Sequence, residues 1–289
     1  MLEFSIPDSA GTYKLNCLLL KLIKEKPYMF YDDFVISSTY GAFNGTTWNG
    51  GRDIFGILSE KDCKKRLQFY NSHNVSYRYT FTNKFIEKRD LFDRYSNMML
   101  RINNNGGVTY NKKIIKNYIK KKYKNYYFVS SCTRNIKDIK NINKISKKEL
   151  IVLDFKLNNS KTLLQLKHPE NVEIVVNEQC FDNCPFREIH YSMMAQNNMF
   201  LNDNQFKLNP MCNRKSGSYQ ECVCSRRHYV SRDRIYKEYL PLGINKFKLV
   251  GRHNSMPDLA LMGYLDYFVK PDYQYEFISL CKMYEIIGG

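Results

Sequence analysis

Five of the nine cysteines fall within one short stretch, and these are the residues whose type and spacing most favour metal chemistry. Grouped thiolates on loops favour zinc or an iron–sulfur cluster. The alternative is that the first two are small buried hydrophobic residues, as free cysteines usually are. A polar segment of weak periodicity, about residues 197–231, carries three of the five and needs something to order it, so we favour metal. The five are Cys180, Cys184, Cys212, Cys222 and Cys224.

The spacing of these cysteines discriminates between kinds of metal site. A zinc ribbon requires two close pairs such as C-x2-C, whereas this chain has C-x3-C and C-x1-C with a third cysteine between them. The C-x3-C-x2-C pattern of radical enzymes that cleave S-adenosylmethionine fails, because Arg187 occupies the third position. All the spacings allow a [4Fe–4S] cluster on Cys180, Cys184, Cys212 and one of Cys222 or Cys224, and zinc is the alternative.

Other side chains with catalytic potential lie close to the first two cysteines. Glu178 follows the apolar run "VEIVV" and is our leading acid–base candidate, because a carboxyl group in such surroundings has a perturbed pKa. It could equally cap the helix expected from Pro185. His190 lies in that helix and either faces the site or is structural. Three arginines, expected just past strand ends, could bind a carboxylate or phosphate or form ion pairs across the site: Arg52, Arg187 and Arg252.

Nucleophile motifs are absent from the sequence. It contains neither G-x-S-x-G nor H-E-x-x-H. A cysteine protease would need Cys180 or Cys184 activated beside His190, and a metal cluster would use the same thiols. The two hypotheses therefore exclude each other.

Short β-branched and aromatic runs alternate with helical segments, which predicts parallel strand pairing. The strands look apolar on nearly every residue, as in a sheet covered on both faces. This pattern predicts a TIM-like (β/α) barrel, complete or incomplete, over residues 1–289, with functional side chains at the C-terminal ends of the strands. A doubly wound sheet is the alternative, but the expected Gly-rich turn is poor. We expect strands at 2–6, 34–39, 77–82, 126–131, 150–155, 173–177 and 246–250, and helices at 11–24, 60–71, 84–101, 112–122, 161–166, 185–195, 232–240 and 256–269.

The charge of the chain is strongly positive and unevenly distributed. The net charge is +17, and residues 111–148 hold twelve Lys and one Arg against the single acid Asp138. Such a segment attracts polyanions, so RNA, DNA or an anionic membrane surface is the expected partner of the Lys112–Lys148 region. The alternative is that these lysines only solvate helix faces. No apolar run approaches membrane-spanning length and no export signal is evident, so we expect a cytoplasmic protein with reduced thiols.

Three motifs, in the right order along the chain, resemble the U32 group, known as peptidase family U32. The segment "LPLGINKFKLVGRHNSMPDLALMGYLDYFV" is similar to the family's signature strand and helix, "FSIPDSAG" to its opening, and "VNEQC" to the segment with its first cysteine. The resemblance implies a barrel, and members that add hydroxyl groups to transfer and ribosomal RNA. It also implies a [4Fe–4S] cluster, whose ligands match Cys180, Cys184, Cys212 and Cys224, with Cys222 as competitor. Val250 departs from the family, which has a glutamate there.

These observations together predict a U32-like iron–sulfur enzyme that hydroxylates an anionic substrate such as RNA. Two alternatives remain, a U32-type peptidase and a non-catalytic, metal-stabilised module that binds nucleic acid. A partner subunit that completes the barrel is also left open.

Overall fold

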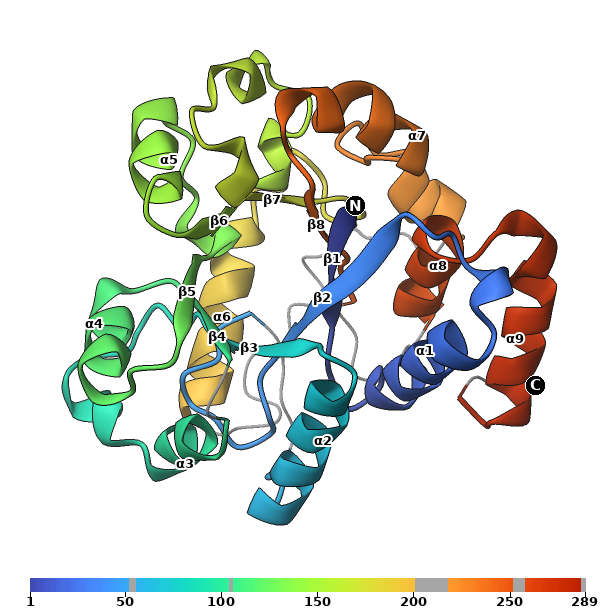
Figure 1. Ribbon diagram of the computed structural model, residues 1–289. Helices are drawn as coiled ribbons and strands as arrows, with labels where there is room; N and C mark the ends of the chain where they lie inside the picture. The colour runs from blue at the N-terminus through green and yellow to red at the C-terminus, as the bar shows by residue number, and fades with distance from the viewer. Residues whose placement is uncertain (52–55, 104–105, 201–217, 252–257, 287–289) are drawn as a thin grey trace.

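Eight parallel strands close into a barrel in a computed structural model of the protein (Figure 1). The structure describes residues 1–51, 56–103, 106–200, 218–251 and 258–286. The strands follow one another in sequence order, and β1 pairs with both β2 and β8. They are β1 (Leu2–Pro7), β2 (Phe34–Gly41), β3 (Ser76–Phe81), β4 (Gly107–Tyr110), β5 (Tyr127–Ser130), β6 (Leu150–Val152), β7 (Val172–Val175) and β8 (Lys246–Lys248). The TIM-like barrel is confirmed, and it closes within one chain, so the incomplete version is wrong.

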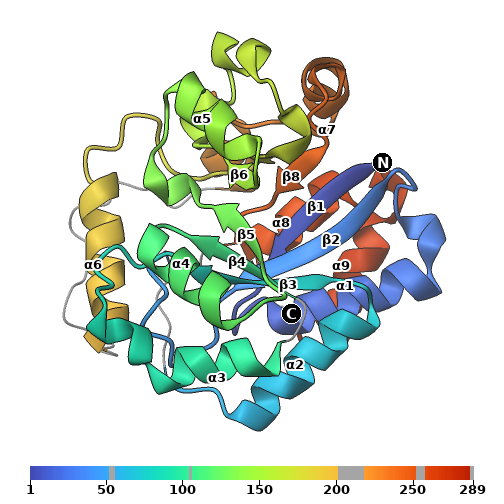
Figure 2. The same ribbon diagram turned by 60° about the vertical axis from the view of Figure 1, so that its left-hand side comes forward.

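Helices alternate with the strands, and most of them cover the outside of the barrel, whereas α6 lies across the C-terminal ends of the strands (Figures 1 and 2). Several begin where a short polar side chain accepts a backbone N–H group of the first turn, as Ser59 does for α2, Asp93 for α3 and Asp138 for α5. The helices are α1 (Tyr13–Glu25), α2 (Glu60–Ser72), α3 (Arg94–Ile102), α4 (Lys113–Lys122), α5 (Ile139–Ser146), α6 (Arg187–Phe200), α7 (Arg232–Arg234), α8 (Asp258–Tyr267) and α9 (Gln274–Met283).

The sequence prediction missed one strand and two helices. β4 is short and begins with Gly107, which reads as a turn residue, yet a Cβ atom there would lie 2.5 Å from the Tyr127 ring. The missed helices are α5 and α9. Because β4 was missed, the strand that precedes Glu178 is the seventh of the barrel and not the sixth.

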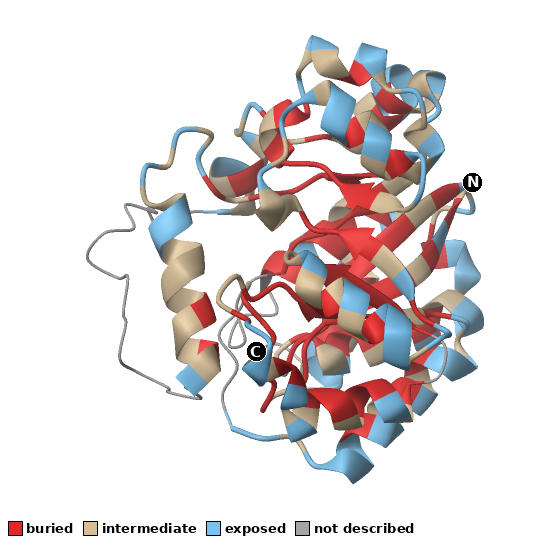
Figure 3. Ribbon diagram, turned by 90° about the vertical axis from the view of Figure 1, so that its left-hand side faces the viewer, coloured by how far each residue is buried: buried red, intermediate tan, exposed pale blue. Residues whose placement is uncertain are grey.

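The main core lies between the outer face of the barrel and the helices (Figure 3). Phe4 of β1 is fully buried there, and its ring contacts Phe247 of β8 and Phe268, which follows α8, with centroid distances of 5.6 and 5.1 Å. Burying a side chain of this size stabilises the fold by about 2 kcal/mol. The helices are therefore held to the barrel mainly by apolar and aromatic packing.

The inside of the barrel is more polar than the sequence suggested. Pairing in register places Ser5, Ser38, Glu173 and Lys248 on its inner surface, with Arg78 beside them. Arg78 Nη1 lies 2.7 Å from Glu173 Oε1, and Ser5 Oγ donates to the same oxygen at 2.6 Å. The expectation of strands apolar on both faces is thus wrong for β1, β2, β3, β7 and β8.

The segment expected as a Cys-rich insertion, about 197–231, is only partly described. Its first four residues belong to α6, and a π-helical turn, Gln220–Cys224, lies near its end. Cys212 lies outside the described residues, as do Arg52 and Arg252.

No helix in the described part of the chain is long and apolar enough to cross a membrane.

Candidate functional site

The C-terminal ends of β5, β6, β7 and β8 bring polar side chains to one mouth of the barrel. Cys132 follows β5, Asp154 follows β6, Glu178 follows β7, and Lys248 ends β8. In a parallel barrel these ends all lie on the same side, which is the side where barrel enzymes carry their active sites. We call this set, together with Arg187 of α6, the mouth site.

Cys132 lies at the centre of the mouth site. It begins a 3-10 turn, Cys132–Arg134, that follows β5. Burial raises the pKa of its thiol, Lys248 and Arg187 lower it, and Asp154 and Glu178 raise it further. Because all four charged groups act on one thiol, they converge from β8, α6, β6 and β7 around it. The net rise favours the neutral thiol over the thiolate.

Lys248 provides a positive charge at the inner end of this site. Its side chain is 8% exposed, and its Nζ lies 3.4 Å from the centroid of the Tyr40 ring. Tyr40 is itself fixed, since its hydroxyl donates to the carbonyl of Leu249 at 2.6 Å. Burial alone would raise the pKa of Glu173 below it, but the charges of Arg78 and Lys248 hold that pKa under its ordinary value. The ammonium group is therefore positioned by an aromatic face and a buried carboxylate.

Arg187 and Asp154 form one wall of the mouth site. Arg187 Nη1 lies 3.1 and 2.8 Å from the two carboxylate oxygens of Asp154, which is fully buried. The guanidinium also lies over the Phe155 ring, 4.5 Å from its centroid. Of the two functions considered for Arg187, the ion pair across the mouth is the one that the structure shows.

Glu178 is buried, with 3% of its surface exposed. Its Oε1 accepts the backbone N–H group of Cys180 at 3.0 Å, so it orders the turn after β7. His228 Nε2 donates to the Glu178 carbonyl at 2.8 Å, and His228 Nδ1 lies 2.7 Å from Asp182. The turn is thus held from both sides, which places the Glu178 carboxyl group in the mouth.

His190 lies in α6, where its ring stacks on that of Tyr191 with centroids 6.2 Å apart. A small pocket of about 90 Å³ opens at the mouth and is lined by Cys132, Cys184 and Arg187, among others. Tyr191 lines this pocket as well, whereas His190 does not.

The cysteines predicted as ligands separate into different surroundings. Cys180 is buried in a cluster with Val129, Val152, Val175 and Val250, against which Cys132 and Cys222 also pack. Cys184 lines the mouth pocket. Burial raises the pKa of Cys224, whose surroundings are Tyr229 and Asp266. Cys222 therefore packs against the buried cluster that contains Cys180.

A metal needs several of these donors in one place. Within the described part of the chain, no three Cys, His, Asp or Glu side chains come together as a metal-binding group. A four-thiolate cluster would require Cys212, which the structure does not describe. The described thiols alone thus do not make up a [4Fe–4S] or zinc site.

Three residues of the mouth site were not among the candidates from the sequence: Lys248, Cys132 and Asp154. The signal for Lys248 was present, because two lysines alternate with apolar residues in "KFKL", as expected when one face of a strand is polar. Cys132 stood alone in the sequence, far from the other thiols, and only closure of the barrel brings it to them.

Comparison with known proteins supports the fold and nothing finer. No family model matches the sequence, and no curated protein matches it. A solved structure described as the U32 peptidase Mk0906 is similar, with a TM-score of 0.56 at 12% sequence identity. The likeness covers 88% of this chain and 94% of that one. The chain therefore shares the barrel fold of that structure.

Proposed function

We propose that this protein is a U32-like enzyme that modifies an anionic substrate at the mouth site, and that the substrate is RNA. The observation that carries the proposal is the convergence of Lys248, Cys132 and Glu178 at the C-terminal ends of three barrel strands. The U32-like barrel is compatible with it, and the positive charge of the chain favours an anionic substrate.

Lys248 acts in this proposal as a fixed cation. An ammonium group held against the Tyr40 ring, away from water, binds a phosphate or a developing oxyanion more strongly than a solvated one. The ion pair of Asp154 and Arg187 keeps the wall of the site in place, so the substrate meets a preformed surface.

Glu178 acts as the acid–base group. Its position in the mouth is set by the Cys180 N–H group, and burial near Cys132 keeps water away from it. A carboxyl group so placed can take a proton from the substrate and return it.

Hydroxylation and a [4Fe–4S] cluster are the finer parts of the proposal, and both rest on the resemblance seen in the sequence. Neither the role of Lys248 as a fixed cation nor that of Glu178 as the acid–base group requires the cluster. Iron analysis of protein purified without oxygen tests it directly, and a colourless protein with one zinc would refute it.

The test of the function compares RNA from cells that express the wild type, Lys248→Met or Lys246→Met. Lys246 is a matched control, since it lies on the same strand but near its other end, paired with Glu3 at 3.2 Å. We expect nucleosides with one added oxygen, detected by mass spectrometry, to fall about a hundredfold or more with Lys248→Met and to persist with Lys246→Met. Equal modification by both variants would refute the mouth site.

A peptidase is the second candidate, and the description of the similar structure favours it. The raised pKa of Cys132 disfavours it, because a cysteine protease needs a thiolate. Casein cleavage that survives iron chelation would support the peptidase. A non-catalytic module would bind RNA and leave no modified nucleoside.

A further inference from the structure

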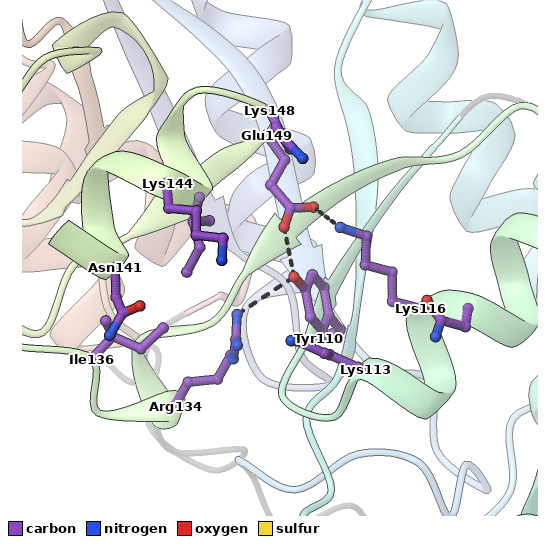
Figure 4. A pocket seen from close by; sticks show the side chains of 11 residues that line it. Tyr110, Lys113, Lys116, Arg134, Ile136, Asn141, Lys144, Lys148 and Glu149 are labelled. Carbon is purple, nitrogen blue, oxygen red and sulfur yellow. Dashed lines mark hydrogen bonds and ion pairs between the residues drawn. The ribbon is translucent and has the colours of Figure 1, made fainter.

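A second pocket, of about 400 Å³, lies between α4 and α5 on the outside of the barrel (Figure 4). Its charged lining consists of Lys113, Lys116, Arg134, Lys144, Lys148 and Glu149, and we call it the basic pocket. Five cations against one carboxylate leave it with a formal charge of +4.

The floor of the basic pocket is built around Tyr110, which is 2% exposed. Its hydroxyl donates to Glu149 Oε1 at 2.6 Å, and Lys116 Nζ lies 2.5 Å from Glu149 Oε2. Burial, reinforced by the bond to Glu149, raises the pKa of Tyr110, so the phenol stays a neutral donor. The single carboxylate is thus occupied by groups of the pocket itself.

Arg134 is fixed on the other side of Tyr110 from α4 (Figure 4). Its Nη1 donates to Ser130 Oγ at 2.7 Å, and its guanidinium lies 5.3 Å from the Tyr110 ring centroid. Lys116 lies 5.2 Å from the same ring. Two cations are therefore held in place by the protein before any ligand arrives, which lowers the entropic cost of binding.

Three further cations surround this preformed pair. Lys113, Lys144 and Lys148 are exposed, and within the described ranges none of them forms an ion pair with a carboxylate. Like charges so close together repel one another, and an anion placed among them relieves that repulsion. The pocket is therefore suited to a ligand with more than one negative charge.

The surroundings of the basic pocket favour a chain of phosphates over a small anion. Helix α4 continues beyond the pocket, and its last three residues, Lys120, Lys121 and Lys122, are all exposed. At its other edge, Arg134 shares its 3-10 turn with Cys132, which lines the pocket at the barrel mouth. A strand lying in the basic pocket would thus pass directly beside the mouth site.

We propose that the basic pocket binds backbone phosphates of the RNA substrate and guides the strand to the mouth site. The choice of RNA rests on the proposed function, whereas the binding of a polyanionic strand rests on the pocket alone.

The test measures binding of fluorescein-labelled oligo(U) to the full chain by anisotropy at several salt concentrations. Lys113→Gln/Lys144→Gln/Lys148→Gln removes three exposed charges from the basic pocket. The matched control, Lys14→Gln/Lys21→Gln/Lys24→Gln, removes three exposed charges from α1, on the other side of the barrel (Figure 1).

We expect the pocket variant to bind on the order of a hundredfold more weakly at about 0.1 M salt, with a log–log salt slope smaller by about 2. Substitution of the same three lysines by Arg should restore most of the affinity. Equal losses of affinity in the pocket variant and the α1 control would overturn the proposal. They would indicate that the overall positive charge of the protein, and not the basic pocket, attracts the strand. Loss of binding to vesicles of anionic lipid, with unchanged binding to oligo(U), would overturn it too.

Failure of this proposal can be told apart from failure of the proposed function. Lys248→Met should keep wild-type affinity for oligo(U) while losing modification. If the pocket variant loses affinity but the wild type modifies no RNA, the pocket stands and the proposed function falls.

Discussion

Replacing Arg78 by methionine would test the buried ion pair that supports the barrel interior. Arg78 and Glu173 have side chains only 7% and 1% exposed, and their closest atoms lie 2.7 Å apart. Removing one partner of a buried pair leaves an uncompensated charge and typically costs about 3–5 kcal/mol. Ser5 and Lys248 would still act on Glu173, so we expect the lower end, about 3 kcal/mol.

The pH dependence of this loss follows from the pKa of Glu173, which is lowered in the folded protein. A lowered pKa contributes stability above the ordinary value of a glutamate, and that contribution disappears as the pH falls through the folded pKa. Without the charge of Arg78, less remains to offset the effect of burial, so the pKa of Glu173 in the folded variant is higher than in the wild type. The stability difference between wild type and variant should therefore be largest near neutral pH and shrink as Glu173 becomes protonated in both.

Urea unfolding followed by the fluorescence of Trp48, the single tryptophan and fully buried, would measure these differences. The control is Lys246→Met, which removes a more exposed pair with Glu3, 23% and 33% exposed, and should cost about 1 kcal/mol or less. A loss for Arg78→Met no larger than for Lys246→Met, or one that grows at acid pH, would refute the reasoning.

Three further predictions concern the turns and thiols around the mouth. Asn83→Ala should destabilise by about 3 kcal/mol in urea unfolding, because the Asn83 amide donates to the carbonyls of Thr47 and Ala195 at 2.9 and 2.8 Å; a loss below about 1 kcal/mol would contradict this. Gly41→Ala should lower the thermal midpoint, since its Cβ would lie 2.4 Å from a backbone carbonyl oxygen, whereas Gly51→Ala meets only an ordinary contact at 3.5 Å and should not; equal shifts would count against it. If the protein binds iron, Cys222→Ser should lose more of it than Cys224→Ser after anaerobic purification, because Cys222 packs against the cluster that contains Cys180; the reverse order would favour Cys224 as the ligand.

Some elements of the fold could be recognised from the sequence and others could not. β7 could be recognised because all its residues except Glu173 are β-branched and apolar, as is usual in parallel strands. β4 could not, since Gly106 and Gly107 read as a turn and only the close approach of Tyr127 explains a glycine within a strand. The start of α5 was readable in principle, because Asp138 caps it three residues before Asn141.

The residues of the mouth site also differed in how readily the sequence revealed them. Glu178 and Cys180 were expected at the end of a strand, and both lie there. Lys248 was passed over because it belongs to a strand, where the alternation of inward and outward residues becomes meaningful only once the barrel closes. Trp48, the single tryptophan, lies in the segment after β2 and is a packing residue, buried against Phe81.

The sequence by itself determined the class of fold, the clustering of five thiols and the excess of positive charge along residues 111–148. These follow from local composition and periodicity, which every segment carries on its own. Only the tertiary structure decided that the barrel is closed, that Cys132 and Lys248 share one mouth, and that Cys222 packs against the cluster that contains Cys180. It also decided which lysines form a pocket around Tyr110 and Glu149. These outcomes depend on which distant strands become neighbours, and strand pairing is set by the packing of the whole chain.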